Sequence, residues 1–378
     1  MERGGVMGVI MESGGEMLMD GVWISQVEKG VEVMGKGRLV VIGGEIGFKG
    51  EHGVYLDKGG VAFLGEVNIK GNGTGKEGIK LNGGMVDLYR TDIRDVYKGV
   101  SVENGIVRME GGEIGFMSGV GNGNYGVKVG SEGNALLNSV SITGSGREGT
   151  GTGVVMDGKM LMMSDVRISG VKMGVEVSEG NLVMHKGSIG FTGNYGIYLI
   201  RGNALFYGVS ITGSGDKSTG MYVGSSGKII MKDVMMSGVG VGAWVTNGGA
   251  MWLGGINLRD VQNGMIVTES TVGMEGGEIT FKGSYGVYLG KSRAALKDVK
   301  MTYMGRNDAV DFMTVQGGKV IAKDIQIYGN GYGQGVKVNG GYVVLIRPSL
   351  NKVRTGVTIQ NAEVTMISSS ITLLEITA

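Results

Sequence analysis

A strand signature of a glycine, an apolar residue, a variable residue and a second apolar residue recurs sixteen times along this chain. Examples are Gly126-Val127-Lys128-Val129 and Gly286-Val287-Tyr288-Leu289. The copies run from Gly8 to Gly356, and only Ala309 takes the place of the glycine. The mean step between copies is about 23 residues, and a period of this length indicates stacked supersecondary units rather than one globular core.

Each repeat contains short segments in which apolar residues alternate with other residues between Gly, Asn and Ser corners, as in Gly196–Leu199, Ala204–Phe206 and Val209–Thr212. Alternation of this kind is typical of strands, and the chain shows no helical 3.6-residue period. Three short strands per repeat predict an all-β chain, folded as a right-handed parallel β-helix (a solenoid) of about sixteen coils. The two apolar positions of the signature should face the core, and the variable position should face solvent.

The period also predicts the boundaries of the solenoid. Residues 1–21 are weakly periodic and are expected to form an N-terminal cap or an irregular first coil. Residues 22–360 are predicted to form the β-helix, and residues 361–378 a C-terminal cap or tail that covers an open sheet end. Extra residues precede the signature at Gly71–Glu77, Gly119–Tyr125, Gly144–Thr152 and Gly329–Gln334. Insertions at one corner predict loops along one edge of the solenoid.

Composition excludes several other classes of protein. The chain has 78 Gly but one Pro and no three-residue glycine period, which excludes collagen. Apolar residues make up 42% of the chain but never run for eighteen positions, so we expect an ordered fold and no membrane insertion of this fragment. The net charge of +1 argues against a nucleic-acid partner. The chain has no cysteine, which suits a large protein that crosses a bacterial outer membrane unfolded.

Candidate catalytic groups are scattered rather than clustered. Four aspartates recur at an equivalent corner of different coils and are interpreted as turn residues: Asp165, Asp233, Asp298 and Asp324. His52 and His185 lie about six coils apart and cannot share a metal ion or a proton. We therefore expect no enzyme activity, no catalytic residue, no metal and no cofactor. The alternative is a polysaccharide lyase or hydrolase. Carboxylates clustered within one or two coils would favour such an enzyme, because its site needs them for calcium binding or acid–base work.

The glycine-rich coils of 21 to 27 residues, the phrases Gly43–Phe48, Asn194–Tyr198 and Val209–Gly215, and the lack of cysteine together resemble the passenger domains of Bartonella autotransporters. The resemblance implies a secreted, extracellular β-helix that is released from the bacterial outer membrane. It also implies binding to the ectodomain of a host receptor tyrosine kinase of the vascular endothelial growth factor receptor type, with promotion of angiogenic signalling. A surface adhesin that binds matrix or glycan is the alternative within the binding proteins.

The variable position of the signature supplies the first candidate binding surface. It is mixed in most copies, as at Glu32, Lys128 and Glu176, but five consecutive copies carry a large apolar side chain. These receptor-binding candidates are Tyr198, Tyr222, Trp244, Ile266 and Tyr288. A contiguous patch of this kind indicates an interaction site. A structural aromatic ladder is the alternative. Trp252, in a parallel run with Leu205 and Ile230, is a further receptor-binding candidate on an adjacent face.

Charge supplies the second candidate surface. Residues 291–354 contain 11 Lys or Arg against four Asp, a local net charge of +7. The basic-patch candidates are Lys291, Arg293, Lys297 and Lys300. A basic end on an otherwise slightly acidic chain predicts attraction to acidic receptor domains or to heparan sulfate. A solvated surface without a partner is the alternative.

Overall fold

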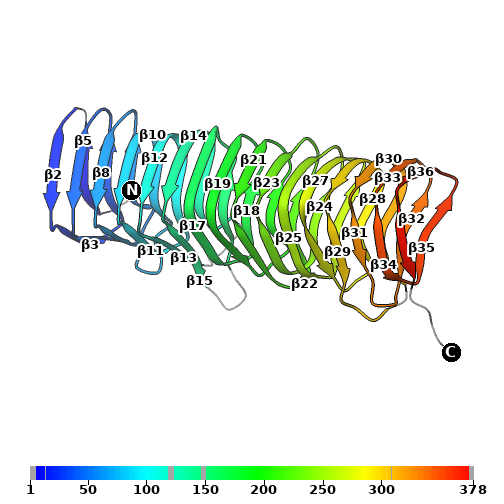
Figure 1. The fold of residues 1–378 in the computed structure, drawn as a ribbon. Helices are drawn as coiled ribbons and strands as arrows, with labels where there is room; N and C mark the ends of the chain where they lie inside the picture. The colour runs from blue at the N-terminus through cyan, green and yellow to red at the C-terminus, as the bar shows by residue number, and fades with distance from the viewer. Residues whose placement is uncertain (1–5, 13, 118–122, 146–149, 308, 374–378) are drawn as a thin grey trace. The chain divides into compact units, whose positions relative to one another are not determined.

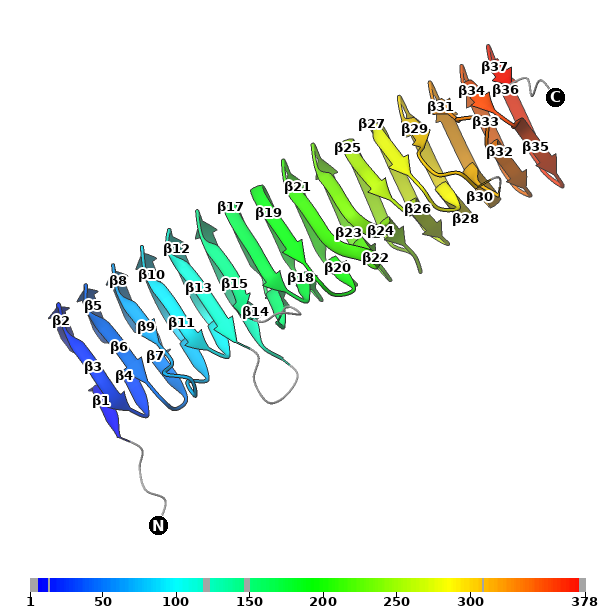
Figure 2. The same cartoon turned by 90° about the horizontal axis from the view of Figure 1, so that it is seen from below.

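A computed structural model of the chain describes residues 6–12, 14–117, 123–145, 150–307 and 309–373. Within these ranges every regular element is a β-strand, and the strands pair in parallel to form a parallel β-helix of about sixteen turns, as predicted (Figure 1). The chain divides into two compact units, Met1–Gly193 (unit 1) and Asn194–Ala378 (unit 2), which are described separately. In each unit, strands of successive turns lie side by side (Figure 2).

Each turn has three faces, and the first face is formed by the signature strands. In unit 1 these are β1 (Met7–Glu12), β4 (Lys29–Met34), β7 (His52–Asp57), the first parts of β10 (Glu77–Tyr89), β12 (Lys98–Glu110) and β14 (Tyr125–Asn138), then β16 (Thr152–Met156) and β18 (Met173–Val177). In unit 2 they are β20 (Tyr195–Leu199), the ends of β22 (Ser210–Val223) and β24 (Met235–Val245), β26 (Asn263–Thr268), the first parts of β28 (Tyr285–Lys297) and β30 (Asp311–Lys323), then β32 (Gln334–Asn339) and β35 (Thr355–Gln360).

The second face follows one corner later in each turn. In unit 1 it is formed by β2 (Glu16–Asp20), β5 (Arg38–Ile42), β8 (Val61–Gly65), the second parts of β10, β12 and β14, and the first parts of β17 (Met160–Val171) and β19 (Asn181–Phe191). In unit 2 it is formed by β21 (Asn203–Tyr207), β23 (Lys228–Lys232), the first parts of β25 (Ala250–Val261) and β27 (Thr271–Phe281), the second parts of β28 and β30, β33 (Tyr342–Ile346) and β36 (Glu363–Ile367).

The third face completes the turn. In unit 1 it is formed by β3 (Trp23–Val27), β6 (Glu45–Phe48), β9 (Asn68–Lys70), β11 (Asp92–Val96), β13 (Glu113–Met117), β15 (Ser141–Ser145) and the ends of β17 and β19. In unit 2 it is formed by the first parts of β22 and β24, the ends of β25 and β27, β29 (Lys300–Tyr303), β31 (Gln326–Tyr328), β34 (Ser349–Val353) and β37 (Ser370–Leu373). At the start of the chain, β1, β2 and β3 pair with β4, β5 and β6, and at its end β36 and β37 pair with β33 and β34.

Close approach between turns explains the glycine of the signature. A Cβ atom at Gly126 would lie 2.2 Å from Cγ2 of Ile142 and 2.7 Å from the carbonyl oxygen of Gly153 in the next turn. Both distances are shorter than any van der Waals contact, so only glycine lets the first strand stack against the inward isoleucine of the third strand. The two apolar signature positions face the core, as at Ile197 and Val287, which are both 0% exposed.

The corner between the second and third strands has a left-handed backbone. The first residue of this corner has a positive φ in each turn, from 46° at Arg90 to 69° at Gly276. In four turns the next residue is a glycine that also has a positive φ: Gly44, Gly112, Gly187 and Gly277. The four recurring aspartates occupy this corner, with φ between 51° and 55°. Aspartate tolerates this conformation better than most non-glycine residues. Their interpretation as turn residues is therefore consistent with the backbone.

One repeat differs from the predicted register. Val287 pairs with Met313, so Phe312, rather than Ala309, stands where the other turns have the signature glycine. The Phe312 ring is fully buried and packs against Phe281, with ring centroids 5.3 Å apart. Periodicity alone misplaced this copy by three residues, because an aromatic side chain replaces the glycine that marks the others.

Candidate functional site

The aromatic row of unit 2 comprises Tyr198, Tyr222, Trp244, Ile266 and Tyr288 on the first face. Parallel pairing places each of these residues directly beside the next in neighbouring turns. The register therefore brings together all five receptor-binding candidates of this row, as alternation along each strand requires.

Ring contacts hold much of the aromatic row together. Tyr198 stacks on Tyr222 with centroids 5.0 Å apart, and Tyr222 meets Trp244 edge to face at 5.8 Å. The Tyr288 hydroxyl donates a hydrogen bond to Gln316 at 2.8 Å. Trp244 is 38% exposed, whereas the other members are half-buried. The row thus has a structural component, with Trp244 as its most accessible member.

The expectation that every variable position faces solvent is wrong at three turns. Glu32, Ser101 and Thr314 are only 7%, 2% and 2% exposed. Polar neighbours cover the first of these: the Glu32 carboxylate accepts a hydrogen bond from Nε2 of His52 at 2.8 Å and pairs with Lys29 at 3.0 Å. Burial lowers the pKa of His52, although the carboxylate acts in the opposite direction.

Trp252 lies on the second face of unit 2 and does not join the aromatic row. Its strand pairing continues the run predicted from the sequence, with Leu205 beside Ile230 and Ile230 beside Trp252. These side chains are 41%, 51% and 52% exposed. The receptor-binding candidates therefore divide between two faces of the same unit.

The basic-patch candidates are also divided between faces. Arg293 and Lys297 project from the second face on β28, Lys291 occupies the preceding corner with φ 48°, and Lys300 begins the third-face strand β29. Lys297 is paired with Glu275, and Lys300 pairs with Glu278 at 2.8 Å. Hydrogen bonding to these carboxylates raises the pKa of both lysines.

A polar groove of about 780 Å³ lies on the first face of unit 1. Three carboxylates line it, and two of them are paired with a lysine: Glu77 with Lys98 at 3.0 Å and Glu103 with Lys128 at 3.0 Å. Oε2 of Glu77 is buried and accepts no hydrogen bond from the described residues. The sequence analysis did not identify this groove, because its ion pairs join residues of different turns.

Tyr125 and Glu176, which also line the polar groove, both have raised pKa values. The Tyr125 hydroxyl donates to Oγ of Ser101 at 3.2 Å, and burial raises the pKa of the tyrosine. Burial also raises the pKa of Glu176, and the charge of Asp157 adds to this effect. The groove therefore offers mixed donors and acceptors to a polar ligand.

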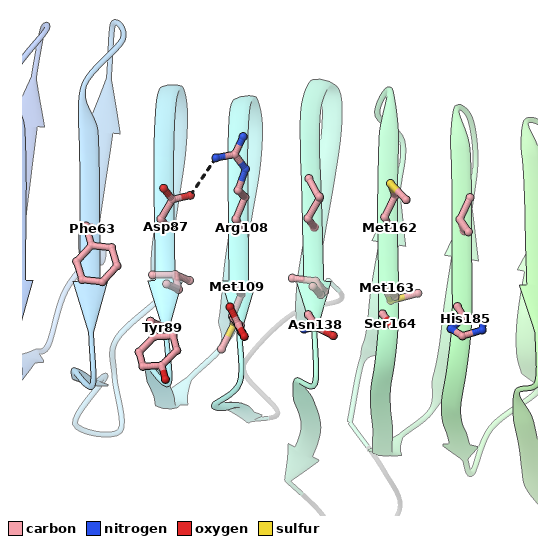
Figure 3. A pocket seen from close by; sticks show the side chains of 15 residues that line it. Phe63, Asp87, Tyr89, Arg108, Met109, Asn138, Met162, Met163, Ser164 and His185 are labelled. Carbon is pink, nitrogen blue, oxygen red and sulfur yellow. Dashed lines mark ion pairs between the residues drawn. The ribbon is translucent and has the colours of Figure 1, made fainter.

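An apolar groove of about 560 Å³ lies on the second face of unit 1 (Figure 3). Phe63, Tyr89 and Met162 line it from separate turns, and the Asp87–Arg108 ion pair at 3.7 Å crosses the same face. The sequence signal for this groove is the run of apolar residues at outward positions of the second strand, among them Phe63 and Met162.

Among the described residues, no group of three or more His, Cys, Asp or Glu side chains is placed to hold a metal ion. No helix in the same part of the chain is long and apolar enough to cross a membrane. The predicted loops at Gly119–Tyr125 and Gly144–Thr152 lie partly outside the described residues.

In comparisons with known proteins, no family model and no curated protein sequence matches this chain. Function must therefore be argued from the surfaces described above.

Proposed function

We propose that this chain is a secreted bacterial passenger domain that binds the ectodomain of a host endothelial receptor and promotes angiogenic signalling. The bacterial source, the secretion and the receptor type, that of vascular endothelial growth factor, rest on the sequence resemblance. The contact surface rests on physical grounds. A nucleic acid and a cofactor have no part in the proposal.

The aromatic row is the observation that carries this proposal. Five adjacent turns present Tyr, Tyr, Trp, Ile and Tyr at one position of one face, and Trp244 near the middle is exposed. Tyr and Trp are the residue types that dominate protein interfaces, and they do so when a rigid scaffold already orders their side chains. Ring stacking in neighbouring turns supplies that order, so binding would cost little side-chain entropy.

Binding without catalysis is the simplest reading of the polar groove. Glu77 and Glu103 are each held by a lysine ammonium group, so neither carboxylate is placed as an unpaired acid or base. Glu176 lies three turns beyond Glu103, so it has no second unpaired carboxylate beside it in the groove. The groove favours a second candidate function, an adhesin that binds a polar glycan. Glycan adhesion is therefore the second candidate function, and no catalytic activity is proposed for the chain.

Treatment of endothelial cells with the purified protein separates the two functions. The receptor proposal predicts dose-dependent phosphorylation of a vascular endothelial growth factor receptor by the free protein. Loss of this response in a Trp244→Ala protein, with the response intact in a Lys128→Gln protein, would support the aromatic row. Absence of phosphorylation, together with Lys128-dependent binding to immobilised glycans, would favour the adhesin instead.

A further inference from the structure

Three rows of outward side chains run along the second face of unit 2, in strands β21 to β33. The middle row is apolar and comprises Leu205, Ile230, Trp252, Ala295, Ile321 and Val344, with Gly273 between Trp252 and Ala295. The row at the start of the strands contains Lys228, Arg293 and Lys319, and the row at their end contains Lys232, Lys297 and Lys323. Cations therefore stand on both sides of the apolar row at Ile230, Ala295 and Ile321, whereas Trp252 is flanked by Ala250 and Gly254.

The apolar middle row is accessible. Ile230 is 51% exposed, Trp252 52% and Ile321 42%. The indole of Trp252 covers Gly273 of the next turn, because a Cβ atom there would lie 2.0 Å from the ring. Neighbouring turns are about 4.8 Å apart, so the row forms a continuous strip rather than isolated apolar residues.

Several of the bordering cations are available to an external anion. Lys228, Arg293 and Lys323 form no ion pair within the described part of unit 2, whereas Lys297 is held by Glu275. Lys232 and Lys319 each lie over a tyrosine ring, at 5.7 Å from the centroids of Tyr207 and Tyr342. The corner carboxylates beside the last row are Asp233, Asp298 and Asp324, of which Asp324 is bound by Arg347.

The same face of unit 1 lacks this pattern. Its outward positions beside the apolar centre are mainly neutral, as at Asn134 and Asn181 in one row and Asn138 and Ser164 in the other. The cationic borders are therefore a property of unit 2 and not a consequence of the fold.

We propose that the second face of unit 2 binds the surface of an anionic phospholipid bilayer. Leu, Ile and Trp side chains would enter the boundary between headgroups and acyl chains, while lysine and arginine stems would extend to the phosphates. Trp and Tyr are the aromatic residues enriched at this boundary. The contact is peripheral, because the apolar strip is one residue wide and lies on a folded sheet.

The chemistry of the rows favours a bilayer over two other partners. The buried centres of protein interfaces are depleted in lysine, whereas here Lys or Arg stands on both sides of the apolar row at three turns, those of Ile230, Ala295 and Ile321. A sulfated glycan would satisfy the cations but would leave the exposed Ile230, Trp252 and Ile321 side chains in water. This inference does not depend on the proposed receptor, which would contact the first face.

Vesicle binding by a protein in which Trp252 is the sole tryptophan, made by Trp23→Phe and Trp244→Phe, tests the inference. We expect sedimentation with vesicles of phosphatidylcholine and phosphatidylserine but not of phosphatidylcholine alone, and weaker binding at higher salt. Trp252 emission should shift to the blue on binding and be quenched by brominated acyl chains. No receptor is present, so failure here leaves the proposed function standing.

Two variants with equal charge loss complete the test. Lys228→Gln, Arg293→Gln and Lys323→Gln together should reduce partitioning on the order of a hundredfold, because each surface cation contributes roughly fivefold. The control, Lys217→Gln, Arg259→Gln and Lys352→Gln, removes three charges elsewhere in unit 2 and should bind nearly as the parent does. Equal loss in both variants, binding without quenching of Trp252, or binding to heparin but not to vesicles would each overturn the inference.

Discussion

The indole ring of Trp252 occupies the space that a side chain at Gly273 would need, since a Cβ atom there would lie 2.0 Å from Cζ3 of Trp252. The two residues are register partners on β25 and β27. Gly273 does not have a positive φ, so the backbone accepts alanine and only the ring must move. The pair therefore offers a way to displace Trp252 without changing it.

We expect Gly273→Ala to turn the Trp252 ring away from the face while the fold stays intact. Tryptophan emission and near-ultraviolet circular dichroism should change in the protein that retains only Trp252. Gly254→Ala is the matched control, because the nearest atom to a Cβ there is 3.8 Å away. Unchanged spectra in the Gly273→Ala protein would contradict the packing of Trp252 over this glycine.

An aspartate substitution should destabilise the fold much more at an inward position than at an outward one. Ile197 is fully buried and Ile230 is 51% exposed. Ile197→Asp should lower the free energy of unfolding by more than about 3 kcal/mol, since it buries an unpaired carboxylate, whereas Ile230→Asp should cost about 1 kcal/mol or less. Urea unfolding, with hydrogen exchange in β22 beside Ile197, measures both. Equal losses would mean that the two positions do not differ in orientation.

The buried His52 predicts a loss of stability in mild acid. Burial holds the pKa of His52 below 6.5 in the folded state, so the unfolded chain takes up the proton first. The stabilisation from neutral His52 is complete above pH 6.5 and disappears as the pH falls through the lowered pKa. The free energy of unfolding should therefore fall as the pH is lowered from neutral to below 6.5, and this part of the slope should be absent in His52→Gln. An identical slope in both proteins would show that His52 does not couple to folding.

The basic-patch candidates should affect association more than folding. Replacing Lys291, Arg293, Lys297 and Lys300 with Gln removes four charges and should slow association with an acidic partner and flatten its salt dependence. Exposed ion pairs contribute little to stability, so losing those to Glu275 and Glu278 should barely change the melting temperature. Lysine-to-arginine exchange at Lys291, Lys297 and Lys300, with Arg293 unchanged, is the control that keeps the charge. An association rate independent of salt in the parent protein would rule out steering by this patch.

The faces and the register of most turns follow from the sequence because strand alternation fixes side-chain direction. Tyr198, Tyr222 and Trp244 could be placed in one row from the spacing of the signature alone. The same reasoning failed near Ala309, where the glycine that sets the frame is replaced by Phe312. A period is informative only while the residue that marks it is present.

Contacts between turns were harder to predict. The burial of Glu32 depends on His52, twenty residues away in the next turn, and the pairing of Lys300 depends on Glu278 in the preceding turn. Pattern analysis reports which face a residue occupies but not how long side chains lean across neighbouring strands. The polar groove of unit 1 and the partial neutralisation of the basic patch were missed for this reason.

Affinity for the receptor ectodomain in a protein with Trp244→Ala and Tyr222→Ala tests the central claim most directly. The control carries Leu205→Ala and Ile321→Ala, which remove similar exposed apolar surface from the second face of the same unit. If the aromatic row is the contact, the first variant should lose more than about 2 kcal/mol of binding to a vascular endothelial growth factor receptor ectodomain, and the control should bind as the parent does. Full affinity in the first variant, with a large drop in its melting temperature, would show that the aromatic row stabilises the solenoid and does not bind the receptor.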